Sequence, residues 1–179
     1  LEAGKRRGGR LLRVGDGVAD ARVGHFLDRS GDEAELAVVI SKICKEVPRE
    51  KANDVIFGYT VANDVTARDL QKKDGQWSRA KGFDSFCPLG PWIDTEFKPE
   101  SQLVTATVNG ELKQSAPLSD MVFDVPFIIE FVTKVMTLLP GDVILTGTPS
   151  GIGPMIAGRE VVVSVEGLGS LRNRVSQRG

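Results

Sequence analysis

Short runs of apolar residues separated by turn-forming residues make up most of this chain, and they predict strands more often than helices. Residues 35–41 (ELAVVIS) are almost continuously apolar, which is typical of a buried strand. Residues 55–61 form a second run, after a short helix that begins at Pro48. Two alternating runs flank Asn109-Gly110, a dipeptide that favours a two-residue hairpin because both turn positions need positive φ.

The C-terminal half contains the clearest helical spacing. Between residues 119 and 138 apolar residues recur every three or four positions, at Val122, Val125, Ile129, Val132 and Met136. Ser119 or Asp120 is expected to cap this helix, and Pro126 is tolerated in its first turn. A strand is expected after Pro140-Gly141, and two more are expected around Gly167–Gly169. Many short strands with one long helix predict an α+β fold that is mainly β, because a doubly wound sheet needs more helices.

The periodic pattern of apolar and polar residues is weak in the first 30 residues. We therefore expect an atypical, partly disordered segment at residues 1–32 and a catalytic domain at residues 33–179. The first segment is rich in Gly and Arg, and it predicts either a disordered arm or two short strands around Asp16-Gly17. A nucleic-acid role for the basic run at residues 4–10 is disfavoured, because no aromatic residues are interleaved with it.

Composition narrows the class of protein. The 179 residues are 41% hydrophobic with a net charge of −1, so the overall charge predicts neither nucleic-acid nor membrane binding. Two cysteines without CxxC spacing indicate ordinary thiols in a reducing compartment. We find no secretory signal and no apolar run of about 20 residues, so the expected location is cytoplasmic.

Glu33 and Glu35 flank the start of the first predicted strand and raise an electrostatic question. Side chains at positions i and i+2 of a strand point the same way, so these two carboxylates are expected to repel each other. Either both face water, or a cation lies between them. Asp64, at the end of the strand 55–61, is a candidate third ligand, although a lone Asp there is more often a cap or turn residue. Three carboxylates without a His or Cys cluster favour a hard cation such as Mg²⁺ or Mn²⁺.

Two further features add candidate chemistry. Lys81 is either a solvated surface residue or a cation that binds a substrate carboxylate or stabilises an enolate. The segment TGTPSGIG, residues 146–153, is neither a P-loop nor a GxGxxG motif. Its backbone N–H groups can form an anion-binding nest.

Taken together, six blocks resemble the fumarylacetoacetate hydrolase (FAH) family over residues 33–175. The blocks are EAELAVVI, GYTVANDVTARDLQ, GQWSRAKGFDSFCPLGPWI, VNGELKQ, MTLLPGDVILTGTPSGIG and EGLGSLRNRV, and they occur in the family's order. The sequences of these blocks are most similar to those of bacterial 2-hydroxyhepta-2,4-diene-1,7-dioate isomerases, and they also resemble those of acylpyruvate hydrolases and oxaloacetate decarboxylases.

The resemblance implies a mixed β-roll with few short helices, a divalent cation (Mg²⁺, Mn²⁺ or Ca²⁺) and a homodimer. It implies Glu33, Glu35 and Asp64 as metal ligands. It also implies Gln71 and Lys81 as catalytic residues facing the substrate, and Thr148 as a substrate-binding residue. The implied substrates are 2-oxo or 1,3-dioxo acids of aromatic and dicarboxylate catabolism, whose enolates a bound metal stabilises.

One expected block is missing from these 179 residues. Family members carry an upstream NYxxHxxE block whose His and Glu activate a water, whereas His25 here has different spacing and neighbours. We therefore assign no catalytic role to His25, and we rank an isomerase or decarboxylase above a C–C bond hydrolase. A non-catalytic family member that binds metal and small dicarboxylates is the alternative.

Overall fold

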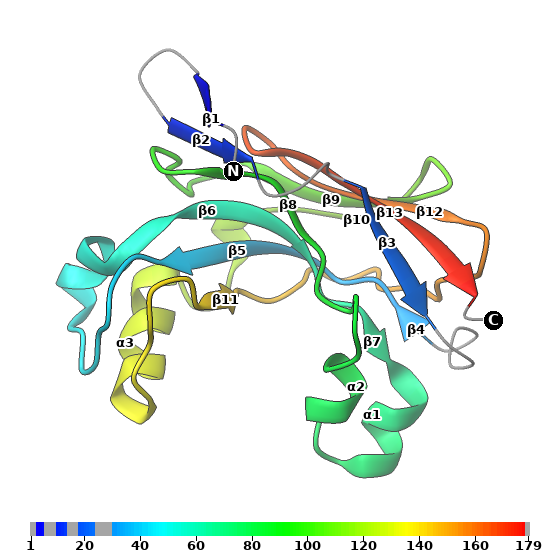
Figure 1. Ribbon diagram of the computed structural model, residues 1–179, viewed down its shortest axis with the longest axis horizontal. Helices are drawn as coiled ribbons and strands as arrows, with labels where there is room; N and C mark the ends of the chain where they lie inside the picture. The colour runs from blue at the N-terminus through cyan, green and yellow to red at the C-terminus, as the bar shows by residue number, and fades with distance from the viewer. Residues whose placement is uncertain (1–2, 6–9, 14–17, 24–29, 178–179) are drawn as a thin grey trace.

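The computed structural model describes residues 3–5, 10–13, 18–23 and 30–177, and within these ranges the chain is built mainly from strands (Figure 1). The larger sheet has the order β1 (Ala3–Lys5), β2 (Arg10–Arg13), β8 (Leu89–Asp94), β6 (Ile56–Asn63), β5 (Ala34–Ile40) and β11 (Val143–Leu145). The second sheet has the order β10 (Glu111–Pro117), β9 (Leu103–Val108), β12 (Glu160–Val165), β13 (Gly169–Gln177) and β3 (Val18–Val23). A small third sheet pairs β4 (Ser30–Gly31) with β7 (Thr66–Ala67). The predicted α+β, mainly β class is confirmed.

The α-helices are short: α1 (Arg68–Asp74), α2 (Ser78–Lys81) and α3 (Val125–Val135), with 3-10 helices at Arg49–Val55 and Leu118–Asp120. The α-helices lie on the same side of β5 and β6, with α3 near one end of these strands and α1 and α2 near the other (Figure 1). None of the helices in the described ranges is long and apolar enough to cross a membrane. The helix pair α1–α2 carries the Lys81 side chain back to the end of β6.

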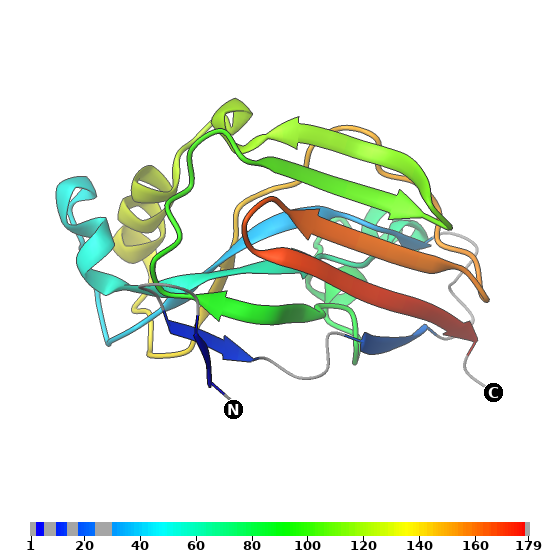
Figure 2. The ribbon, with the colours of Figure 1, turned by 90° about the horizontal axis from the view of Figure 1, so that it is seen from above.

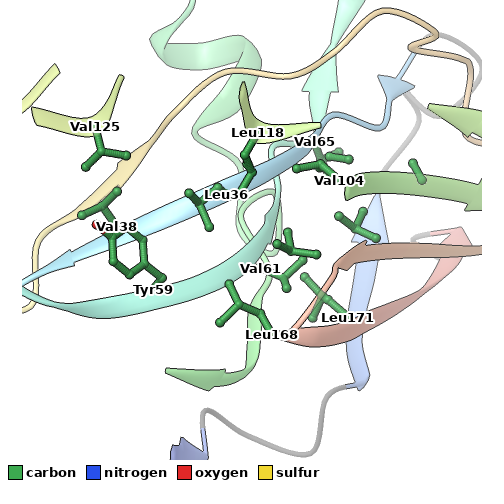
Figure 3. Close-up of a cluster of buried hydrophobic side chains, with 14 of the residues drawn as sticks. Leu36, Val38, Tyr59, Val61, Val65, Val104, Leu118, Val125, Leu168 and Leu171 are labelled. Atoms are coloured by element: carbon green, nitrogen blue, oxygen red, sulfur yellow. The ribbon is translucent and has the colours of Figure 1, made fainter. Parts of the chain in front are cut away.

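The core lies between β5 and β6 on one side and the five-stranded sheet on the other (Figures 2 and 3). Leu36 and Val61 meet Leu171 there, and all three side chains are almost fully buried. Because successive side chains of a strand point to opposite faces, Leu36 faces this core whereas Glu35 faces the other side of the sheet. The apolar positions of β5 therefore fix the direction in which its carboxylate points.

Most elements predicted from local patterns are present. The hairpin at Asn109-Gly110 joins β9 to β10, and both turn residues have positive φ, 50° and 81°. Gly75 has the left-handed conformation and ends α1. The Asn109-Gly110 turn was predictable because these two residue types readily adopt the positive φ that a two-residue hairpin needs.

The expected N-cap of the long helix was wrong. Asp124, rather than Ser119 or Asp120, caps α3: its carboxylate accepts a hydrogen bond from the Phe127 N–H at 2.9 Å, and the helix starts beside Pro126. Ser119 and Asp120 instead lie in the preceding 3-10 turn.

The two short strands expected around Asp16-Gly17 are present as β2 and β3, and their partners lie elsewhere in the fold. β2 pairs with β1 and β8, whereas β3 runs parallel to β13 in the other sheet. The turn between them lies outside the described residues, and the division of the chain at residues 1–32 and 33–179 stays a prediction.

We expect Asp124→Ala to lower the free energy of unfolding by about 1 kcal/mol, because an N–H at the start of α3 loses its acceptor. The ion pair between Arg49 and Asp124 is exposed and adds little. Urea denaturation measures the change. Asp120→Ala is the matched control and should cost close to nothing; an equal loss in both variants would contradict the capping role of Asp124.

Candidate functional site

Three carboxylates meet where β5 begins and β6 ends. Glu33 precedes β5, Glu35 lies in it, and Asp64 follows β6. The antiparallel register places Ala34 opposite Asn63, and the Asp64 N–H donates to the Glu33 carbonyl oxygen at 2.9 Å. One oxygen from each carboxylate lies within 4.8 Å of the others, and all three residues are buried. The strand pairing therefore brings together the three residues that the sequence had indicated.

Two cations lie on this carboxylate triad, which we define as Glu33, Glu35 and Asp64. The Lys81 ammonium, at the end of α2, donates to Glu33 Oε2 at 2.9 Å and also to Asp64 Oδ2. The Arg68 guanidinium, at the start of α1, donates to Glu33 Oε1 at 2.5 Å. The segment α1–α2 thus brings two positive charges to Glu33 and Asp64, and Lys81 lies beside the acidic cluster.

The electrostatics of the triad favour a further positive charge. Burial raises the pKa of Glu35 to about 7. A hydrogen bond from the Gly147 N–H opposes this rise, and the negative charges of Asp64 and Glu33 add to it. Burial also raises the pKa of Asp64 despite its bond to Lys81. Burial alone would lower the pKa of Lys81, but its bonds to Asp64 and Glu33 outweigh that effect and raise it. Lys81 is therefore an ammonium at neutral pH.

The donor set of the triad fits a divalent cation. Carboxylate oxygens are the ligands that Mg²⁺, Mn²⁺ and Ca²⁺ prefer, and these three already converge. Glu35 is the most isolated from the protein's own cations, since neither Lys81 nor Arg68 donates a hydrogen bond to it among the described contacts. A bound dication would supply the positively charged partner that the Glu35 carboxylate lacks among these contacts.

The glycine-rich loop, residues 146–153, is hydrogen-bonded to β5. Thr146 donates from its N–H and its Oγ1 to the Leu36 carbonyl oxygen, at 3.2 and 3.0 Å. The Gly147 N–H donates to Glu35 Oε2 at 2.6 Å. The sequence suggested that this loop offers N–H groups to an anion, and one of them binds the chain's own carboxylate.

Gly151 shows how closely the loop packs. Its φ is +101°, and an added Cβ would come within 2.1 Å of the Lys113 carbonyl oxygen. A side chain at this position would push the loop away from β10, so only glycine keeps it there.

Gln71 and Thr148 lie beside the triad and are linked to it through other residues. Gln71 Oε1 accepts from Arg68 Nη1 at 3.1 Å, and both side chains line a cavity of about 610 Å³ together with Lys72 and Gly153. Thr148 is joined through the Gln114 side chain to Ala34, between the two glutamates. Their roles as substrate-facing residues stay predictions, and His25 lies outside the described residues.

The sequence did not indicate three residues that contact the triad or the groups around it: Arg68, Thr66 and Gln114. Arg68 and Thr66 stand in the block that contains Asp64, and the Thr66 hydroxyl accepts from Lys81 at 3.0 Å. Gln114 stands in VNGELKQ, one of the blocks that carry the family resemblance. The Gln114 side chain is only 1% exposed. A polar residue within a predicted strand was the one sequence feature that could have indicated it.

Comparison with known proteins places these features in a recognised family. A family model described as the C-terminal region of fumarylacetoacetate (FAA) hydrolase matches residues 18–176. The chain spans between 56% and 60% of the length of several curated relatives that it matches.

Three named proteins illustrate the similarity. Oxaloacetate tautomerase YisK of Bacillus subtilis is 43% identical over 153 residues, covering 80% of this chain and 51% of that protein. The structure of 2-hydroxyhepta-2,4-diene-1,7-dioate isomerase from Mycobacterium marinum has a TM-score of 0.88 and 48% identity, covering 91% of this chain and 66% of that one. Maleylpyruvate hydrolase from Sphingobium, solved with manganese(II) and pyruvate, has a TM-score of 0.83 and 35% identity, covering 91% and 61%.

Proposed function

Because this chain belongs to the fumarylacetoacetate hydrolase family, we propose that it carries the catalytic region of a divalent-metal-dependent enzyme. The substrate is a 2-oxo or 1,3-dioxo (di)carboxylate, and the reaction is an isomerisation, including keto–enol tautomerisation, or a decarboxylation. The observation that carries this proposal is the buried carboxylate triad with the Lys81 ammonium lying on two of its members.

The triad would hold the metal through Glu33, Glu35 and Asp64, and Mg²⁺ or Mn²⁺ suits these oxygen donors. A bound dication withdraws electrons from a 2-oxo carboxylate and stabilises its enolate. Lys81 already bonds two of the three ligands, so a dication must compete with its ammonium for Glu33 and Asp64.

The protein's own groups then orient the substrate. Lys81, kept charged by its carboxylate neighbours, offers a positive charge to a carboxylate or to the developing enolate oxygen. Gln71 and Arg68 line the adjoining cavity and offer donors to the distal part of a dicarboxylate. Thr148 offers the hydroxyl of the glycine-rich loop, which Gln114 links to the backbone between Glu33 and Glu35.

The choice of isomerisation or decarboxylation rests on two supports. Both reactions need enolate stabilisation, which the carboxylates and cations of this site can provide. Relatives at 43% and 40% identity are named oxaloacetate tautomerases. C–C bond hydrolysis is the second candidate, because the similar Sphingobium enzyme is a maleylpyruvate hydrolase.

Turnover assays test the proposal. We expect the chain with Mg²⁺ or Mn²⁺ to accelerate oxaloacetate enol–keto interconversion or decarboxylation, to lose this activity in EDTA, and to regain it when metal is added back. Acylpyruvate cleavage, assayed in parallel, separates the hydrolase candidate. Tight metal binding without turnover of any of these substrates would instead favour the non-catalytic alternative.

A homodimer and a cytoplasmic location remain our predictions. Light scattering of the purified chain tests the first, with twice the 19.3 kDa chain mass expected.

A further inference from the structure

Gln114 is a buried amide whose three hydrogen bonds connect three separate segments. Its Oε1 accepts from the Ala34 N–H at 3.0 Å, and its Nε2 donates to Thr148 Oγ1 at 2.9 Å and to the Pro149 carbonyl oxygen at 2.7 Å. The side chain is 1% exposed. Both amide hydrogens and the amide oxygen therefore have partners, and none is spare for another role.

The chemistry of these partners determines which way the amide points. The Ala34 N–H can only donate, so it must face the amide oxygen. The Pro149 carbonyl oxygen can only accept, so it must face the amide nitrogen. The flip that is ambiguous for many Gln side chains is thus excluded here, and the second N–H is aimed at Thr148.

This orientation determines the polarity of the Thr148 hydroxyl. A hydroxyl has one hydrogen and two lone pairs. Since Thr148 Oγ1 accepts the Gln114 N–H, its own hydrogen remains to be donated away from Gln114. An acceptor, such as a carboxylate or carbonyl oxygen, satisfies this hydroxyl better than a donor does.

Two neighbouring backbone segments determine the position of Gln114: its own strand β10 with the glycine-rich loop, and the start of β5. β10 has a register shift between Leu112 and Gln114, and the loop packs against Lys113 through Gly151. On the other side, β11 pairs with β5 only at residues 37–39, so the Ala34 N–H lies beyond the β11 ladder. The Gln114 side chain takes the place of a strand partner there, one residue from both Glu33 and Glu35.

We propose that Gln114 is a positioning residue that fixes Thr148 as a hydrogen-bond donor to the acceptor oxygen of the substrate. The inference rests on the proposed function, because it assigns an orientation to the substrate-binding hydroxyl of that site. Gln114 acts through Thr148, and its substitution should leave the metal ligands unaffected.

The test is a double-mutant cycle of Gln114→Glu and Thr148→Val, read by calorimetry as the Kd of oxalate for the Mg²⁺-loaded chain. Glutamate has the shape of glutamine and keeps the acceptor for the Ala34 N–H, but it presents an oxygen to Thr148 Oγ1 and to the Pro149 carbonyl oxygen. Both bonds of the amide nitrogen are lost, and the Thr148 hydrogen should turn inward. Each single variant should weaken oxalate binding about tenfold or more. The double variant should be no weaker than Thr148→Val alone, because both changes remove the same donor.

Control variants separate positioning from loss of structure. Gln102 also bridges backbone groups, Lys98 O and the Glu100 N–H, so Gln102→Glu should leave oxalate binding unchanged. The Kd of Mg²⁺ should be unchanged in Thr148→Val and Gln102→Glu. If Gln114→Glu does not fold, Gln114→Met removes the donor to Thr148 without adding charge, and the same non-additivity is expected. Because methionine also removes the acceptor of the Ala34 N–H, its Kd for Mg²⁺ is measured beside its Kd for oxalate.

Each outcome decides a different claim. Additive losses, or a Gln114 effect that persists fully in the Thr148→Val background, would overturn the positioning role while leaving the proposed function standing. Failure of the unmodified, Mg²⁺-loaded chain to bind oxalate would overturn the proposed function and, with it, this inference.

Discussion

Glu35→Gln is expected to abolish the thermal stabilisation that Mg²⁺ or Mn²⁺ gives to this protein. A ligand at 100 times its Kd adds about 2.7 kcal/mol to the free energy of unfolding. For a domain of this size that corresponds to a rise in Tm of roughly 5–10 °C, which thermal denaturation measures directly. Glutamine keeps the acceptor for the Gly147 N–H, so the loss reports the missing charge rather than a disrupted loop.

Without metal, the same variant should be more stable than the parent protein above pH 7. Burial raises the folded-state pKa of Glu35 to about 7, whereas an unfolded Glu titrates near 4.5. The folded protein therefore binds the proton more tightly, and stability is lost as pH rises through this window. Removing the ionisable group should recover on the order of 2–3 kcal/mol at pH 8.

The exposed Glu100 offers a matched control, since Glu100→Gln should change neither the metal effect nor its pH dependence. If Mg²⁺ raised the Tm of Glu35→Gln as much as that of the parent protein, Glu35 would not be a metal ligand.

Lys81→Met should separate metal binding from substrate binding. The ammonium contacts Glu33 and Asp64, so its removal leaves Asp64 without its bonded cation and Glu33 with Arg68 alone, which lowers the stability of the metal-free protein. Mg²⁺ should then bind at least as tightly as before, because no ammonium competes for those ligands. Oxalate or oxaloacetate should bind about 10- to 100-fold more weakly, since a charge-assisted hydrogen bond is lost.

Isothermal titrations with Mg²⁺ and then with oxalate measure both effects. Lys73→Met, an exposed change in α1, should leave both Kd values unaltered. Unchanged oxalate affinity in Lys81→Met would remove Lys81 from the substrate site.

Local sequence indicated candidate members of the acidic triad because strand geometry is regular. The E-x-E spacing places Glu33 and Glu35 on one side, and the adjacent strand ends beside Glu33, which makes Asp64 a neighbour. The family resemblance indicated the same three residues. Turn chemistry was equally local, as the Asn109-Gly110 hairpin shows.

Contacts between distant segments could not be predicted in this way. Gln114 meets a backbone N–H 80 residues away, and nothing in VNGELKQ indicates that partner. β3 pairs with β13 rather than with β2, because hydrogen bonding between strands is decided by the whole sheet. The cap of α3 was misplaced for a simpler reason. Val122 fits the apolar spacing but is 88% exposed, and the helix begins only after Asp124.

The most direct test of the account is diffraction from crystals of this chain grown with Mn²⁺ and oxalate, with data collected to reveal anomalous scattering. We predict a single strong peak between Glu33, Glu35 and Asp64, at coordination distance from all three carboxylates, with oxalate oxygens completing its ligands. A manganese peak that misses this cluster, or oxalate bound away from the metal, would contradict the assignment of the triad as the catalytic metal site.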